Sequence, residues 1–171
     1  MTDEQQRIRG YLQAQGAKLS PADVVDKVRA AMRDLRAAAD AVPADRFDEV
    51  PAPDEWSANQ VMAHVLDAGR HFGDQILAVL DAAPRAGVAR AAADTERRTA
   101  ADWCARLDRD REALFERVLR ADPSSRLDAT IEHGMFGPLN WRETLLFMRL
   151  HDLDHVGQLQ KIAAALAARP A

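Results

Sequence analysis

The sequence predicts an all-α protein, most simply a four-helix bundle preceded by a short helix. Alanine is abundant and aromatic residues make up only 5% of the chain, a composition that favours helices over sheets. Apolar residues recur at helical spacing in four long segments, and no segment alternates apolar and polar residues long enough to predict a strand. The chain contains no internal repeat and no linker-like segment, so residues 1–171 are expected to form one helical-bundle domain.

The first two helices are indicated by residues that cap helix N-termini. Thr2 can cap a short helix, which we expect to end near Gly16. The Ser20-Pro21 pair is a stronger start, because a cap residue is followed by proline at the first helical position. The long helix that begins there is expected to end at Pro43. Its apolar residues recur at helical spacing: Val24, Val25, Val28, Met32, Leu35, Ala39 and Val42.

The next two helices are separated by a long connection. Ser57 caps the second long helix, after the proline-rich segment 50–55. Its apolar face carries one histidine: Val61, His64, Val65, Ala68, Phe72, Ile76 and Val79. Residues 81–98 are rich in alanine and arginine and are predicted to form a long loop. Thr99 caps the third long helix, which Pro123 ends. Its apolar residues are Trp103, Leu107, Leu114 and Val118.

The last long helix begins at Asn140 and is predicted to run to about Ala168. It is apolar nearly all round, unlike a helix that packs on one side only. The second apolar face lies opposite the histidines of this helix and comprises Leu146, Leu150, Leu153 and Val156. A helix that is apolar on both faces is central or covered by a partner, so we expect a homodimer.

Composition and charge exclude several classes of function. The net charge is −4, which gives no electrostatic footprint for nucleic acid or for an anionic membrane. The single cysteine, Cys104, excludes an intramolecular disulfide bond. The N-terminal sequence MTDEQQRIRG lacks the apolar centre of a signal peptide, and no apolar run is long enough to span a bilayer. We therefore expect a cytoplasmic protein whose partner is a small molecule.

Two histidines interrupt the apolar stripe of the last helix, in the segment HDLDHVGQLQKI. At about 100° per residue, His151 and His155 lie about 40° apart, on the side that carries Met148, Leu159, Ile162 and Leu166. Both imidazoles are therefore predicted to point into the core, with Gln158 beside them. His64 lies on the core face of its own helix. Neighbouring helices of a bundle can bring these three side chains together.

A divalent metal ion would explain three inward imidazoles. Each unpaired polar group in a core costs about 1–3 kcal/mol, and an ion removes that cost by taking one nitrogen of each ring as a ligand. The spacing of His151 and His155 is the helical spacing that lets two rings reach one ion. The glutamate of the HExxH protease motif is absent, because Asp152 follows His151. The alternative is that these are ordinary buried or exposed histidines, which are more common on helices than ligands are.

Two segments of the chain resemble the DinB/YfiT-like family of metalloenzymes. They are EWSANQVMAHV, which includes the Trp56-Ser57 entry to a helix, and GPLNWRETLLFMRLHDLDHVGQLQKI. The shared motif is a histidine early in one helix and HxxxHxxQL late in the last helix. In this sequence the motif residues are His64, His151, His155, Gln158 and Leu159. The resemblance extends roughly from Ser20 to Ala168.

The resemblance implies a four-helix bundle of up-down-down-up topology that is commonly dimeric. It implies a nickel, zinc or iron ion on the three histidines, with the remaining coordination positions left to water. Some relatives use a low-molecular-weight thiol, such as mycothiol, bacillithiol or glutathione, in transferase or isomerase reactions. The resemblance implies no DNA binding.

Other polar residues are candidates for the surroundings of the site. His71 lies on the face of His64 but about 10 Å further along the helix, so it is a candidate for the pocket mouth. His133 lies in the connection before the last helix and is a candidate pocket residue. Asp67 and Asp154 are placed to orient an imidazole, although solvated surface charge is their more common role. Cys104 is interpreted as a packing residue with no activating partner.

The leading prediction of function is a metal-dependent enzyme, with metal-bound water or a metal-bound thiolate as the nucleophile. A low-molecular-weight thiol would be its cosubstrate and a small electrophile its substrate. One alternative is a metal-dependent hydrolase in which water attacks. The other is a non-enzymatic dimer that binds a metal or a small molecule. An enzyme needs a titratable group within hydrogen-bond reach of the open site, whereas a structural metal site is closed by a fourth protein ligand.

Overall fold

The computed structural model describes residues 1–83 and 96–168, and it confirms the prediction of an all-α bundle. The elements in chain order are α1 (Asp3–Lys18), α2 (Pro21–Asp40), the 3₁₀ helix η1 (Ala44–Arg46), α3 (Ala58–Leu80), α4 (Ala100–Leu119), β1 (Ile131–His133), β2 (Gly137–Leu139) and α5 (Trp141–Ala167). Most of the loop predicted over residues 81–98 lies outside the described residues. Within the described ranges, no helix has a stretch long and apolar enough to cross a lipid bilayer.

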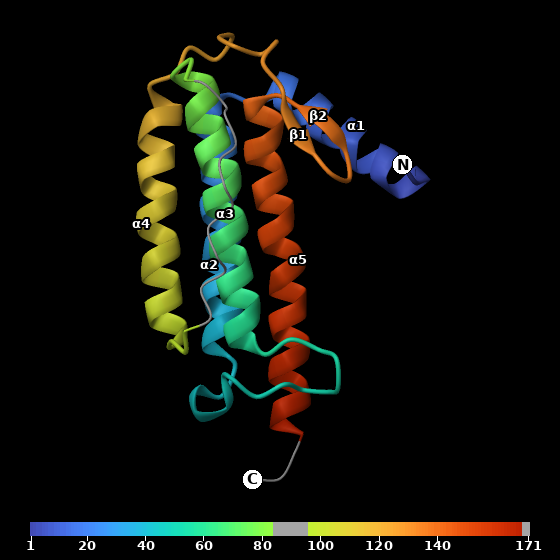
Figure 1. The fold of residues 1–171 in the computed structure, drawn as a ribbon, viewed down its shortest axis with the longest axis vertical. Helices are drawn as coiled ribbons and strands as arrows, with labels where there is room; N and C mark the ends of the chain where they lie inside the picture. The colour runs from blue at the N-terminus through green and yellow to red at the C-terminus, as the bar shows by residue number, and fades with distance from the viewer. Residues whose placement is uncertain (84–95, 169–171) are drawn as a thin grey trace.

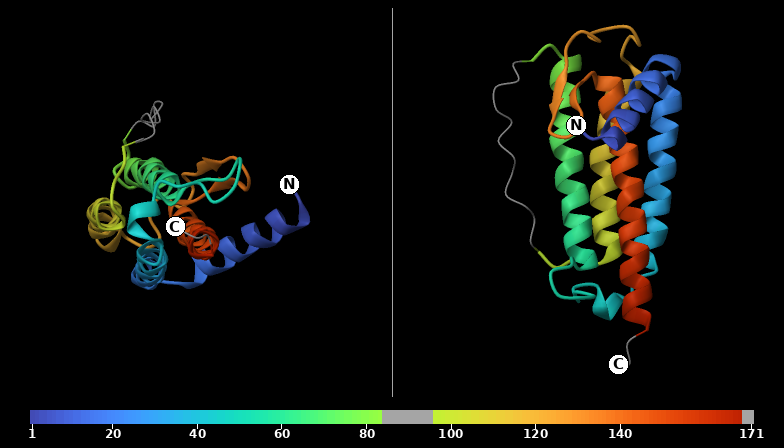
Figure 2. Two further views of the ribbon diagram at one scale, coloured as in Figure 1. Left: turned by 90° about the horizontal axis from the view of Figure 1, so that it is seen from below. Right: turned by 90° about the vertical axis from the view of Figure 1, so that its right-hand side faces the viewer.

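The four long helices α2 to α5 have the up-down-down-up topology. In Figure 1, α2 and α5 run in one direction and α3 and α4 run in the other. Seen along the bundle axis, α5 lies between α2 and α3, and α4 contacts α2 and α3 on the other side (Figure 2). The helices α3 and α5 are therefore antiparallel neighbours. This arrangement places the first turns of α3 beside the C-terminal half of α5.

All five α-helices begin at the predicted cap residues. In each helix the side chain of the cap residue accepts a hydrogen bond from the backbone N–H of the residue three positions later. The side chain of that later residue accepts a hydrogen bond from the backbone N–H of the cap residue. The caps are Thr2, Ser20, Ser57, Thr99 and Asn140. A cap of this kind stabilises a helix by about 1 kcal/mol, so these residues fix where each helix begins.

The first helix ends at Lys18, within two residues of Gly16 as expected, but Gly16 itself lies inside the helix. Gly16 is buried where α1 packs against α5. A Cβ atom at this position would lie 2.9 Å from Cγ of Glu143, closer than side chains approach one another. The glycine therefore allows two helices to pack closely, and it does not end the helix.

A short β-hairpin between α4 and α5 was not predicted. Its two strands are antiparallel, with Ile131 opposite Leu139 and His133 opposite Gly137. Each strand has three residues, which is too short for an alternating pattern to be recognised. Gly137 has a φ of +68°, in the left-handed region that favours glycine. Ile131 and Leu139 are buried, so the hairpin packs its apolar side against the bundle.

The core between the helices contains two tryptophans whose polar atoms are satisfied. The indole N–H of Trp103 donates to Oδ1 of Asn59 at 2.7 Å, and that of Trp141 donates to the carbonyl oxygen of Ser125 at 2.9 Å.

Cys104 is also buried, as expected of a packing residue. Burial raises the pKa of the Cys104 thiol to about 11, so the thiol is protonated at neutral pH.

Candidate metal centre

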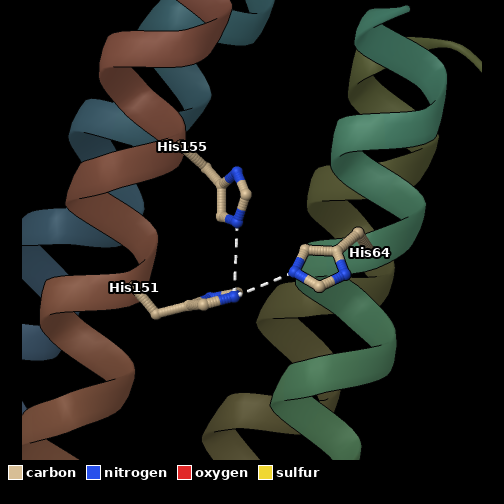
Figure 3. A group of neighbouring side chains, drawn as sticks. All are labelled: His64, His151 and His155. Carbon is tan, nitrogen blue, oxygen red and sulfur yellow. Dashed lines mark hydrogen bonds between the residues drawn. The ribbon is translucent and has the colours of Figure 1, made fainter. Parts of the chain in front are cut away.

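Three histidines from two antiparallel helices converge at one point (Figure 3). His64 projects from the start of α3, and His151 and His155 project from successive turns of α5. Nε2 of His151 lies 3.1 Å from Nε2 of His64 and 3.3 Å from Nε2 of His155. One ring nitrogen from each histidine lies within 4.8 Å of the other two. The predicted inward direction of all three rings is therefore what brings them together.

This donor set fits a divalent metal ion. A tetrahedral zinc ion with Zn–N bonds of about 2.0–2.1 Å separates its ligand nitrogens by about 3.3 Å. The separations of 3.1 and 3.3 Å from the His151 nitrogen are close to that value. Imidazole nitrogens are common ligands for zinc, nickel and iron. The three histidines can therefore hold a divalent ion.

His155 is oriented by a neighbouring side chain. Its Nδ1 lies 2.8 Å from Oε1 of Gln158, one turn further along α5. An amide oxygen only accepts hydrogen bonds, so Nδ1 carries the proton and the Nε2 lone pair points toward the other histidines. Burial lowers the pKa of His155, and the charge of His151 lowers it further. Both effects favour the neutral ring that a metal ion requires.

Of the predicted surrounding residues, the aspartates and His71 lie outside the group of three. Asp154 is solvent-exposed, and Asp67 is half-buried one turn after His64. His71 lies two turns further along α3 than His64. Its Nε2 lies 2.8 Å from Nε2 of Gln75. Among residues 1–83 and 96–168, no further histidine, cysteine or carboxylate joins the cluster.

His133 lies in an aromatic cluster that extends to the site. Its ring stacks on Phe72 and Phe136, at centroid distances of 5.3 and 4.8 Å. The ring of Phe147 contacts both His133, at 4.1 Å, and His151, at 5.8 Å. Burial lowers the pKa of His133, and the charge of His151 adds to this. His133 is therefore a buried neutral residue one aromatic ring away from the candidate ligands.

A cleft opens beside the histidines. It has a volume of about 590 Å³, and its lining residues are Asp54, Glu55, Trp56, His155, Gln158, Lys161, Ile162 and Ala165. The ring of Trp56 lies edge-on to His64 at 5.2 Å and is 42% exposed. The sequence identifies Trp56 only as part of the entry to a helix, because no sequence pattern predicts that the segment before α3 lies against α5. Trp56 thus joins the cleft to the histidine cluster.

The pKa of His133 predicts how the metal-free protein responds to acid. The unfolded chain binds a proton at this residue below about pH 6.5, whereas the folded protein resists protonation. Stability from this residue is therefore present above about pH 6.5 and lost as the pH falls below it. We expect the melting temperature to fall between about pH 7.5 and about pH 5.5, and to fall less steeply in His133→Phe. Equal pH slopes for the two proteins would contradict this assignment.

Together, the up-down-down-up bundle and its three facing histidines define a helical-bundle protein with a candidate metal site between α3 and α5. The chain belongs to the DinB superfamily, whose profile matches residues 27–159 and so includes all three histidines. The crystal structure of TT2238, described as a four-helix bundle protein, is similar, with a TM-score of 0.63 and 22% sequence identity. The similarity covers 83% of this chain and 99% of TT2238, and it shows a shared fold. A search of curated proteins found no match to this chain.

Proposed function

We propose that this protein is a metal-dependent enzyme that activates a low-molecular-weight thiol, for transfer to a small electrophile or for a thiol-assisted isomerisation. The proposal depends on one observation above all. Three imidazole nitrogens face one another between α3 and α5, and a cleft reaches one of the three rings. The proposed ion is zinc, nickel or iron, each of which accepts imidazole ligands.

The donor set favours an open site. Only three candidate ligands gather in the described ranges, which supports a site with a coordination position left for water or a thiol. Neutral ligands also leave the charge of an ion uncompensated. When bound, such an ion would supply Lewis acidity and lower the pKa of a coordinated water or thiol.

The cleft supports a small organic substrate. Its volume of about 590 Å³ falls in the range typical of small-molecule sites, about 300–1,000 Å³. Trp56 offers a flat apolar surface beside His64, while Lys161 and the two acidic residues Asp54 and Glu55 offer charges of both signs. A substrate in this cleft would be held next to the candidate ligands His155 and His64.

The nucleophile would be the sulfur of the thiol cosubstrate. Cys104 cannot take this role, because it is buried and its thiol has a pKa of about 11. In the transfer reaction, the deprotonated sulfur would form a carbon–sulfur bond with the electrophile. The leaving group would depart with the bonding electron pair, and the thiol proton would pass to solvent.

A titration of the cobalt(II) protein with thiols tests this proposal. We expect a sulfur-to-cobalt charge-transfer band on addition of mycothiol, bacillithiol or glutathione, because an open position lets a thiolate coordinate. Cys104→Ser should keep the band and the thiol-dependent activity, whereas His155→Ala should lose both. If no thiol produces the band or supports turnover, the proposal fails. The hydrolase or the non-enzymatic binding protein would then take its place.

We also propose that the protein is a homodimer that associates through α5. Leu150, Leu153 and Val156 are half-buried on the face away from the histidines, although α1 also packs against α5. Leu146, on the same predicted face, is buried within the chain, and Leu150 and Val156 pack partly against the core, so a second copy would cover only the remaining half-buried part of this face. Light scattering at micromolar concentration should give twice the mass of one chain, and Leu153→Glu should give a folded monomer. A monomeric wild-type protein under these conditions would contradict the proposal.

A further inference from the structure

A buried ion pair lies next to the candidate metal centre. It joins Arg111 of α4 to Asp152 of α5, with Nη2 and Oδ1 3.1 Å apart. The two side chains are only 2% and 0% exposed. Asp152 directly follows the candidate ligand His151 in the sequence. The sequence places Asp152 beside the histidine stripe, and it does not predict the partner on α4.

A third helix makes room for this pair. Gly69 of α3 is buried opposite Arg111. A Cβ atom at position 69 would lie 3.2 Å from both Nε and Nη2 of Arg111, closer than ordinary van der Waals contact. Three helices thus contribute to the position of one guanidinium group, with glycine on α3, arginine on α4 and aspartate on α5.

Stability alone does not account for this pair. Two ions lose their hydration on burial, and well-packed apolar residues of similar volume often stabilise a core as well or better. The hydrogen bonding is also incomplete within the described residues. Oδ2 of Asp152 and both Nε and Nη1 of Arg111 are buried and make no hydrogen bond there. A role for the charge itself would account for an ion pair kept at this cost.

The position of the carboxylate indicates that function. Oδ1 of Asp152 lies 3.9 Å from Nδ1 of His151, whereas Nε2 of the same ring faces His64 and His155. A negative charge on the Nδ1 side favours the ring form in which Nδ1 carries the proton and Nε2 has a free lone pair. Solvent does not screen the charge of the buried carboxylate, although the guanidinium of Arg111, which bonds to the same Oδ1, offsets part of it. Gln158 acts on His155 in a similar way, because its neutral amide oxygen accepts a hydrogen bond from Nδ1 and leaves the Nε2 lone pair free.

We propose that Asp152, held in place by Arg111, is a positioning residue that orients His151 toward a divalent metal ion and strengthens it as a ligand. This inference rests on the proposed metal site. It adds two residues, on α4 and α5, that the group of three histidines does not include. Carboxylates or carbonyls behind metal-bound imidazoles typically change metal affinity by about 10- to 100-fold.

Zinc affinity of the metal-free protein, measured by competition with a chromophoric chelator, tests the role of the charge. Asp152→Asn keeps the size of the side chain and an oxygen that can accept from Arg111, but it removes the negative charge. We expect its zinc dissociation constant to rise about 10- to 100-fold. Asp34→Asn is the control, because Asp34 is an exposed aspartate on α2, a helix that carries none of the candidate ligands. Its dissociation constant should stay within about twofold of the wild-type value.

A second variant separates positioning from structural support. Arg111→Met combined with Asp152→Leu replaces the pair by apolar side chains and should melt at or above the wild-type temperature without metal. Its zinc affinity should nevertheless remain weakened. Wild-type affinity in this double variant, or in Asp152→Asn, would overturn the inference. If the wild-type protein binds no zinc, the proposed metal site fails and this inference fails with it. If the wild-type protein binds zinc and the variants bind it equally well, only this inference fails.

Discussion

Replacement of His151 by alanine should abolish metal binding while the bundle stays folded. His151 is the central member of the cluster, since its Nε2 is the atom that lies 3.1 Å from His64 and 3.3 Å from His155. Its loss leaves two ligands, so we expect affinity to fall by more than about 100-fold, the upper effect of losing an outer-sphere partner. Alanine is the best helix former, and the side chain is half-buried, so α5 should keep its helical content. Elemental analysis and circular dichroism measure the two effects.

His71→Ala is the control for this experiment. It removes an imidazole from the same face of α3 that carries His64, but His71 is not a member of the cluster. This variant should retain the ion. If His151→Ala and His155→Ala both kept a full complement of metal, the assignment of the ligands would be wrong.

Replacement of Trp141 by alanine should have the largest effect on stability. Trp141 is the first residue of α5 and is 0% exposed, and its indole N–H holds the connection after α4 through the carbonyl of Ser125. Truncation of a buried tryptophan costs about 3–5 kcal/mol, a large share of a typical stability of about 5–15 kcal/mol. We expect the melting temperature of the metal-free protein to fall by about 10 °C or more.

Trp56→Ala is the matched control for Trp141→Ala. Trp56 is 42% exposed and lies in the segment before α3, so its removal should change stability by no more than about 1 kcal/mol. Equal losses of stability in the two variants would show that the burial of Trp141 is not what matters. Chemical denaturation of both variants gives the comparison.

The helices and the three histidines could be predicted from the sequence because their signals are local. Cap residues such as Ser57 and Asn140 mark helix starts through hydrogen bonds within one turn. The direction of His151 and His155 follows from the 3.6-residue period of the helix, which places them on the stripe of buried residues. The contact of His64 with these two histidines does not follow from a local signal. It depends on the antiparallel packing of α3 on α5.

The features that were missed depend on contacts between distant segments. Glycine is typical of helix C-termini, so the sequence predicts that the first helix ends near Gly16. Only the contact of Gly16 with Glu143 shows that two helices pack closely there. In the sequence alone, Asp152 serves only to exclude a protease motif, because its partner Arg111 lies 41 positions away on another helix. The ring of Trp56 contacts that of His64 because the segment before α3 folds back, and no local sequence pattern predicts that conformation. In each case the sequence contained the residue, and the fold supplied its role.

The most direct test of the proposed metal centre is the metal content of the wild-type protein, purified without a nickel column and measured by elemental analysis. Convergence of three imidazole nitrogens between α3 and α5 predicts about one divalent ion per chain. It also predicts that a chelator removes the ion and that added zinc restores it. A protein that contains no ion and takes up none when zinc, nickel or iron is supplied would contradict the proposed centre.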